Sequence, residues 1–150
     1  MVSCSFLVYN DGGQFMCTTQ LRFSITASKV CPFVLDGDVN TAWHQDRSLE
    51  LPVDLIIDLG EMQELNGFRY HPDMGLWGPG IITHFEFFVS TDNKNCKKVS
   101  SGEFSNIKNN PLWQVKEFNS EKARFIKFRA LANTEGNNNI GYAEIEVITN

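Results

Sequence analysis

Residues 83–90 read Thr-His-Phe-Glu-Phe-Phe-Val-Ser, a segment in which every second side chain is large and apolar. Successive side chains of an extended strand point to opposite faces, so this alternation predicts a strand with one buried face. The same two-residue period recurs at residues 54–59, 126–129 and 143–147, and Gly60 is expected to end the first of these runs. The fold is therefore predicted to rest on half-buried β-strands.

Further strands are expected where β-forming residues lie between turn-forming clusters, namely at 21–27, 65–70, 97–104 and 113–118. Glycine, aspartate, asparagine and proline gather between the strands, at 36–38, 73–80, 91–95, 106–111 and 133–141. No window has the 3.6-residue period of a long helix, and the nearest approach is a single turn around Pro32–Leu35. About eight short strands of this kind predict an all-β fold, an antiparallel β-sandwich of the jelly-roll type.

The alternation also assigns an inward face to each strand and so predicts the hydrophobic core. Its expected members are Trp43, Ile57, Leu59, Phe85, Phe87, Ile126, Phe128, Ile145 and Val147.

The totals fit one domain with a mixed, acidic surface. The chain has 150 residues and a net charge of −5, which argues against nucleic acid or an anionic membrane as partner. No run approaches the roughly 20 apolar residues of a membrane span. Residues 1–20 are less patterned and are expected to be a leading strand or an upstream linker, with the module itself at 21–150.

The sequence predicts neither a zinc site at the cysteines nor a catalytic site. Cys4, Cys17, Cys31 and Cys96 lack the spacing of a zinc site, and their even count permits disulfides without requiring them. Cys96 is expected to be a small buried apolar group. Nucleophile-elbow and phosphate-loop motifs are absent, and no pair of carboxylates is placed at a shared cleft, so catalysis is not expected.

Six short motifs in a fixed order resemble those of one family. The segment Val34-Leu35-Asp36-Gly37-Asp38, followed by Thr41-Ala42-Trp43-His44, is similar to the corresponding element of discoidin (factor 5/8 type C) domains and family 32 carbohydrate-binding modules. The others lie at 57–60, 67–70, 80–90, 123–127 and 141–145. The resemblance implies a jelly roll of the galactose-binding-domain-like kind.

The resemblance also implies a structural calcium ion held by Asp36, Asp38, Thr41 and Glu144. Calcium takes six to eight oxygen ligands, and an Asp-Gly-Asp turn supplies side-chain and carbonyl oxygens together. The alternative is that the two aspartates only form a turn.

For a ligand site, the resemblance points to His44, to the loop 71–78 with His71, Asp73 and Trp77, and to Asn139. An aromatic ring beside a few polar groups is what a sugar needs. Many galactose-binding relatives have arginine where this chain has Asp73, so galactose is not implied. The alternatives are a surface imidazole at His44, a Trp77 ring that plugs the end of the sandwich, and a simple asparagine-rich turn.

The predicted function is a non-catalytic carbohydrate-binding module. The resemblance is to modules appended to bacterial exo-glycosidases, such as α-L-fucosidases and chitobiase-type hexosaminidases of Bacteroides-like bacteria. It implies a secreted, periplasmic or cell-surface location, with carbohydrate and the catalytic domain of the same chain as partners. The alternative is a structural or protein-binding discoidin domain without a sugar site. Lipid binding would need apolar spikes and basic residues, which this acidic chain scarcely supplies.

Overall fold

The computed structural model describes residues 35–44, 50–75 and 80–150, and within these ranges it contains strands and turns but no helix. The strands are β1 (Trp43–His44), β2 (Val53–His71), β3 (Ile82–Ser90), β4 (Lys97–Glu103), β5 (Gln114–Asn133), β6 (Gly141–Tyr142) and β7 (Glu144–Thr149). The predicted strand at 21–27 lies outside the described residues. Across the described ranges, no helix has the length and apolar character needed to cross a membrane.

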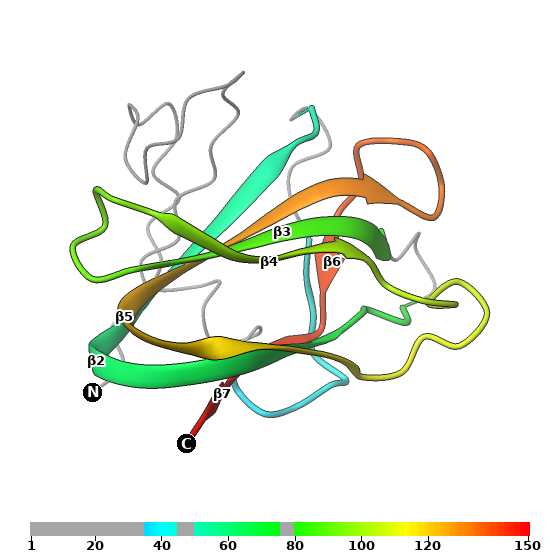
Figure 1. The fold of residues 1–150 in the computed structure, drawn as a ribbon. Coiled ribbons are helices and arrows are strands. Elements are labelled where there is room, and N and C mark those ends of the chain that lie inside the picture. The colour runs from blue at the N-terminus through cyan, green and yellow to red at the C-terminus, as the bar shows by residue number, and fades with distance from the viewer. Residues whose placement is uncertain (1–34, 45–49, 76–79) are drawn as a thin grey trace.

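Two antiparallel sheets make up the described fold (Figure 1). The larger has the order β4-β3-β5-β2-β7, and the smaller pairs β1 with β6. The prediction of an all-β, antiparallel architecture is thus confirmed.

The core lies on the face of the large sheet that the alternation predicted. In the strand register, Leu55, Phe128 and Phe87 are aligned across β2, β5 and β3, as are Ile57, Ile126 and Val89 in the next inward row. All nine predicted core residues pack into the core, with Val147 only partly buried at its edge.

Aromatic rings fill the centre of this core. The Phe68 ring stacks on Phe87 with a centroid distance of 4.1 Å, and it meets Phe85 and Phe128 edge-on at 5.4 and 5.7 Å. Stacked and edge-on pairs each add to the energy of burying these large side chains.

The opposite face of the sheet is also buried at its centre, which the alternation did not predict. Asp54, Phe88 and Lys127 are each less than 10% exposed. Arg129 donates to both Asp54 oxygens at 2.6 and 2.8 Å, and the Lys127 ammonium lies 4.2 Å from the centre of the Phe88 ring. Burial lowers the pKa of Lys127, while the Asp54 carboxylate opposes that shift.

The strands are longer than predicted. Gly60 does not end its strand: with a φ of 84° it sits at a register shift between Asp58 and Gln63, and β2 continues to His71. A left-handed φ costs glycine little, so the chain bends there without losing its pairing. The segments expected at 113–118 and 126–129 likewise belong to one strand, β5, which begins at Gln114 and so excludes only Trp113.

The prediction for Cys96 was wrong. Its side chain is half-exposed and forms a disulfide with a cysteine outside the described residues. The residue lies just before β4, beyond the point where the core-facing alternation ends.

Candidate functional site

The small sheet carries His44 to the end of β2. Trp43 pairs with Tyr142 and His44 with Gly141, and the Ala143 amide donates to the His71 carbonyl at 3.1 Å. The Trp43 ring is buried against Tyr142, whereas His44 points outward, as expected for neighbours on an extended chain.

His44 and Asp73 form the closest polar contact at this end. The His44 Nε2 atom lies 2.5 Å from Asp73 Oδ2, and the Gly75 amide donates to Oδ1 at 2.9 Å. The His44 side chain is 35% exposed and that of Asp73 is 13% exposed, so solvent reaches the pair mainly on the His44 side. Since an ionised carboxylate only accepts, Nε2 carries the hydrogen, and a neutral His44 then keeps Nδ1 as an acceptor.

His71 lies beside Trp113 and not beside His44. Its Nδ1 donates to the Pro72 carbonyl at 2.9 Å, and its ring meets the Trp113 ring edge-on at 5.0 Å. Trp113 immediately precedes β5, and its contact with His71 was not predicted from the sequence. The signal in the sequence was weak, because the two residues are brought together only by the pairing of Tyr70 with Gln114.

The asparagines before β6 mainly shape their own loop. Asn139 is 5% exposed; its amide donates to Asn137 Oδ1, and its carbonyl accepts from Asn133 Nδ2. Asn138 Oδ1 accepts from the Leu51 amide at 3.4 Å. A Cβ at Gly80 would lie 2.7 Å from the Asn139 carbonyl oxygen, so only glycine fits beside this loop. Trp77 lies outside the described residues.

Three of the four residues expected around calcium gather near one point. The Thr41 hydroxyl donates to Asp36 Oδ2 at 2.8 Å, and the amide of Gly37, next to Asp36, donates to Glu144 Oε2 at 3.1 Å. The fourth, Asp38, turns its carboxylate to Asn40 and offers only its carbonyl to Thr41. Among the described residues, no three carboxylate, imidazole or thiol groups converge on one point.

The donor chemistry nevertheless fits a hard cation. Glu144 is 1% exposed, and burial together with the nearby Asp36 and Glu146 carboxylates raises its pKa to about 7. A buried carboxylate in this position is stabilised by a positive ion, and the hydroxyl and carbonyl oxygens around it are ligands that calcium accepts.

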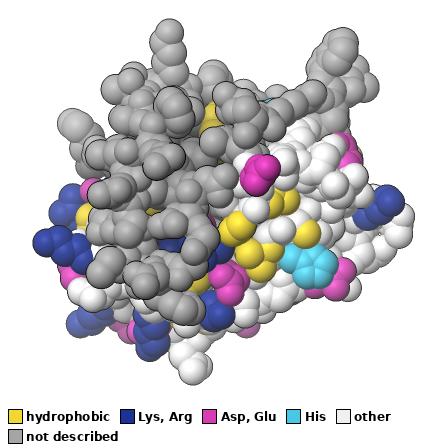
Figure 2. Space-filling view, turned by 90° about the horizontal axis from the view of Figure 1, so that it is seen from above, with side chains coloured by type: hydrophobic (Ala, Val, Ile, Leu, Met, Phe, Trp, Pro, Cys, Tyr) yellow, Lys and Arg dark blue, Asp and Glu magenta, His cyan; other side chains and the backbone are white. Residues whose placement is uncertain are grey.

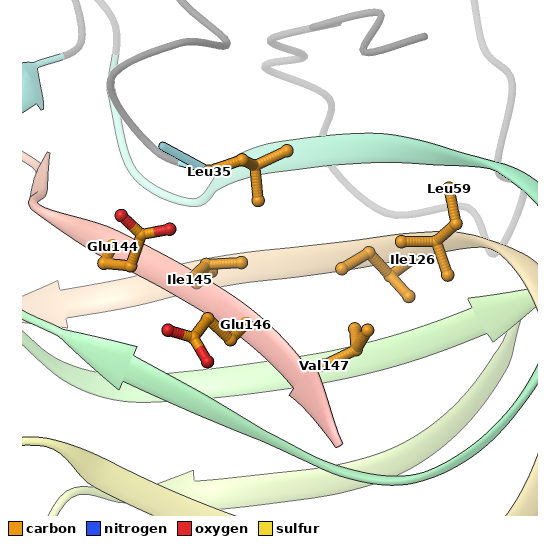
Figure 3. A pocket seen from close by; sticks show the side chains of 7 residues that line it. All are labelled: Leu35, Leu59, Ile126, Glu144, Ile145, Glu146 and Val147. Atoms are coloured by element: carbon orange, nitrogen blue, oxygen red, sulfur yellow. The ribbon is translucent and has the colours of Figure 1, made fainter. Parts of the chain in front are cut away.

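A pocket of about 240 Å³ lies beside β7, the strand that carries Glu144 (Figure 3). Five aliphatic side chains line it together with two carboxylates: Leu35, Leu59, Ile126, Ile145, Val147, Glu144 and Glu146. None of these residues belongs to the His44–Asp73 pair. Its lining, mostly aliphatic, contains no aromatic ring on which a sugar could stack.

Basic and acidic side chains are interspersed on the surface. On the face shown in Figure 2, lysine and arginine side chains lie next to aspartate and glutamate side chains along one border. Lys98 contacts Glu86 at 3.0 Å, and Arg124 donates to both Asp58 oxygens at 2.8 Å. The absence of a nucleic-acid partner stays a prediction.

Known proteins identify the family of this domain. The family model of the F5/8 type C domain matches residues 17–145. The boundary expected between residues 1–20 and 21–150 stays a prediction.

Among solved structures, the module CpGH89CBM32-5 from Clostridium perfringens, in complex with GalNAc-beta-1,3-galactose, is 34% identical with a TM-score of 0.69, over 78% of this chain and 81% of that one. The family 32 module of Clostridium perfringens NanJ, in complex with galactose, is 26% identical with a TM-score of 0.66, over 77% and 81%.

A glycoside hydrolase 29 family member from an unknown rumen bacterium is 36% identical with a TM-score of 0.58, over 66% of this chain but 18% of that one. The match therefore covers a small part of a longer glycoside hydrolase chain. The resemblance read from the sequence motifs is confirmed, and the chain belongs to the F5/8 type C domain family.

Proposed function

We propose that this domain is a non-catalytic carbohydrate-binding module of an exported glycoside hydrolase. The observation that carries the proposal is the His44–Asp73 pair, which is hydrogen-bonded and reaches solvent on its His44 side, where the small sheet meets the end of β2. Similar modules were solved with GalNAc-beta-1,3-galactose and with galactose bound, and a similar domain occurs within a glycoside hydrolase 29 chain.

The pair suits a sugar that donates hydroxyl hydrogens. The Asp73 carboxylate and the Nδ1 atom of a neutral His44 are both acceptors, so hydroxyl donors bind best. Few such bonds outcompete water, and we expect a dissociation constant on the order of millimolar to tens of micromolar. The module would then act by holding its enzyme near the glycan and raising the effective concentration of substrate.

We predict that His44→Ala weakens sugar binding about tenfold, because it removes one hydroxyl partner and frees Asp73 to reorient. Titration calorimetry with galactose, fucose and N-acetylglucosamine-terminated oligosaccharides measures the loss. The control is His84→Ala, since His84 is 51% exposed and its nearest carboxylate, on Glu103, is 3.8 Å away. Binding unchanged in His44→Ala, or no binding of any of these sugars to the parent domain, would contradict the proposal.

We also propose that a calcium ion binds beside Asp36 and Glu144. The residues that would hold it are Asp36, Glu144 and Thr41, with Asp38 contributing its carbonyl or a reoriented carboxylate. The ion would neutralise the buried Glu144 carboxylate and join the turn at 36–41 to β7.

Calcium is therefore expected to raise the melting temperature of the parent domain, and Asp36→Ala to abolish the rise, since a ligand of the native state alone stabilises that state. Glu144→Gln should also lose the rise, yet without calcium it should melt no lower than the parent, because its neutral amide replaces a buried carboxylate. The control is Asp92→Ala, which removes an aspartate from another turn, where it accepts from the Lys94 and Asn95 amides. An identical melting temperature in calcium and in chelator would refute the site.

A further inference from the structure

A row of four side chains crosses the outer face at the end of the sheet. Glu146 on β7 accepts from Arg69 Nε at 2.7 Å, the Arg69 guanidinium lies 4.4 Å from the centre of the Trp113 ring, and His71 meets that ring edge-on at 5.0 Å. Glu146 balances the charge of Arg69, so the row carries no unpaired charge when His71 is neutral. The ion pair between Arg69 and Glu146 and the cation–π contact between Arg69 and Trp113 together fix the orientation of the Trp113 ring.

His71 is held in one tautomer with an acceptor to spare. Its Nδ1 donates to the Pro72 carbonyl, so in the neutral imidazole Nδ1 carries the hydrogen and Nε2 is an acceptor. No protein group within hydrogen-bond distance of Nε2 is found among the described residues. A half-exposed acceptor therefore lies next to a half-exposed aromatic ring.

The ring is flanked by apolar side chains that face solvent. Leu112, one residue before Trp113 in the chain, is 58% exposed, and Val115, two residues after it, is 52% exposed. An apolar surface with one polar group at its edge is the combination that a sugar ring needs, with its C–H face against the aromatic and one hydroxyl toward the acceptor.

The Asp73 member of the His44–Asp73 pair lies close to His71 along the chain. Asp73 follows His71 by two residues, and two extended residues span roughly 7 Å, a distance comparable to the length of one sugar ring. Pro72 favours extended backbone at the preceding residue, His71, which is the last residue of β2.

We propose that His71 and Trp113 form a second subsite, which takes a neutral sugar ring adjacent to the one bound at His44 and Asp73. The inference rests on the proposed function and deepens it: the ligand is an oligosaccharide of at least two units. His71 and Trp113 determine its length, while His44 and Asp73 bind its first sugar.

The test compares mono- and disaccharides on the same domain. The first probes are galactose, N-acetylgalactosamine and GalNAc-beta-1,3-galactose. Fucose and N-acetylglucosamine follow, each compared with a disaccharide that contains it. The parent domain should bind at least one disaccharide about tenfold more tightly than either of its monosaccharides. Trp113→Ala should remove this gain and leave monosaccharide affinity within about twofold, whereas His44→Ala should weaken both.

Two conservative variants distinguish loss of the binding surface from failure of the domain to fold. Trp113→Phe keeps an aromatic ring and should retain most of the gain, and His71→Phe keeps the ring contact but removes the Nε2 acceptor and should lose part of it. Met62→Ala, which removes a 50% exposed apolar side chain from another part of β2, is the control and should keep the gain. Melting temperatures identify any variant that fails to fold.

The possible results distinguish failure of the second subsite from failure of the proposed function. If the parent domain binds monosaccharides and disaccharides equally, or Trp113→Ala keeps the gain, the second subsite is refuted and the proposed function stands. If the parent domain binds none of the probes, both are refuted.

Discussion

Phe68→Ala is expected to lower the free energy of unfolding by about 3–5 kcal/mol, the range seen for large aromatic side chains removed from a core. Phe68 is fully buried, and its ring contacts the rings of Phe85, Phe87 and Phe128. These partners come from β3 and β5 and cannot close the cavity without breaking their own stacking. Urea denaturation followed by tryptophan fluorescence measures the change.

Two controls bracket this expectation. Phe68→Leu keeps most of the apolar volume and should cost clearly less than the alanine variant. Leu112→Ala removes a side chain that is 58% exposed and should change stability by no more than about 0.5 kcal/mol. A loss below about 1 kcal/mol for Phe68→Ala would mean that the aromatic cluster is not the centre of the core.

Asp54→Ala is expected to destabilise the domain by about 3–5 kcal/mol, because it leaves buried positive charge without its partner. The Asp54 carboxylate is bonded by Arg129 through two nitrogens and lies 3.8 Å from the Lys127 ammonium. Burial already lowers the pKa of Lys127, and the loss of Asp54 would remove the main group that opposes this shift. Chemical denaturation of the variant at neutral pH measures the effect.

Asp58→Ala is the matched control. Arg124 bonds Asp58 through the same two nitrogens at 2.8 Å, but the Arg124 side chain is 44% exposed whereas that of Arg129 is 20% exposed. Because the Arg124 side of this pair is open to solvent, its loss is expected to cost less than that of Asp54, about 1 kcal/mol. Equal losses for the two variants would show that burial does not govern the energy of these pairs.

Alternation predicted the inward face well because burial there follows from the strand period alone. The rows through Phe87 and Val89 are aligned as the period requires. It could not predict the burial of Phe88 and Lys127, since covering the second face depends on contacts between distant segments. Gly60 was mistaken for a strand end because a glycine permits either a turn or a bulge, and local sequence does not decide between them.

In the candidate site, too, local patterning predicted some features, whereas contacts between distant segments could not be predicted. The outward direction of His44 followed from its position next to the buried Trp43. The contact between His44 and Asp73 did not, because it joins residues 29 apart and depends on where β1 pairs with β6. Likewise the resemblance predicted that Asp36 and Glu144 share a metal site, but it could not show that the Asp38 carboxylate turns toward Asn40.

The pairing of β1 with β6 has a consequence for how the domain is made. His44 pairs with Gly141, and the His71 carbonyl accepts from the Ala143 amide, so both halves of the proposed sugar surface form only after the ribosome has added residues 141–143. Contacts of such long sequence separation form slowly, after the loop between them has closed. A nascent chain halted before residue 141 would therefore not be retained on a glycan resin, and the onset of retention during synthesis would time the completion of the fold.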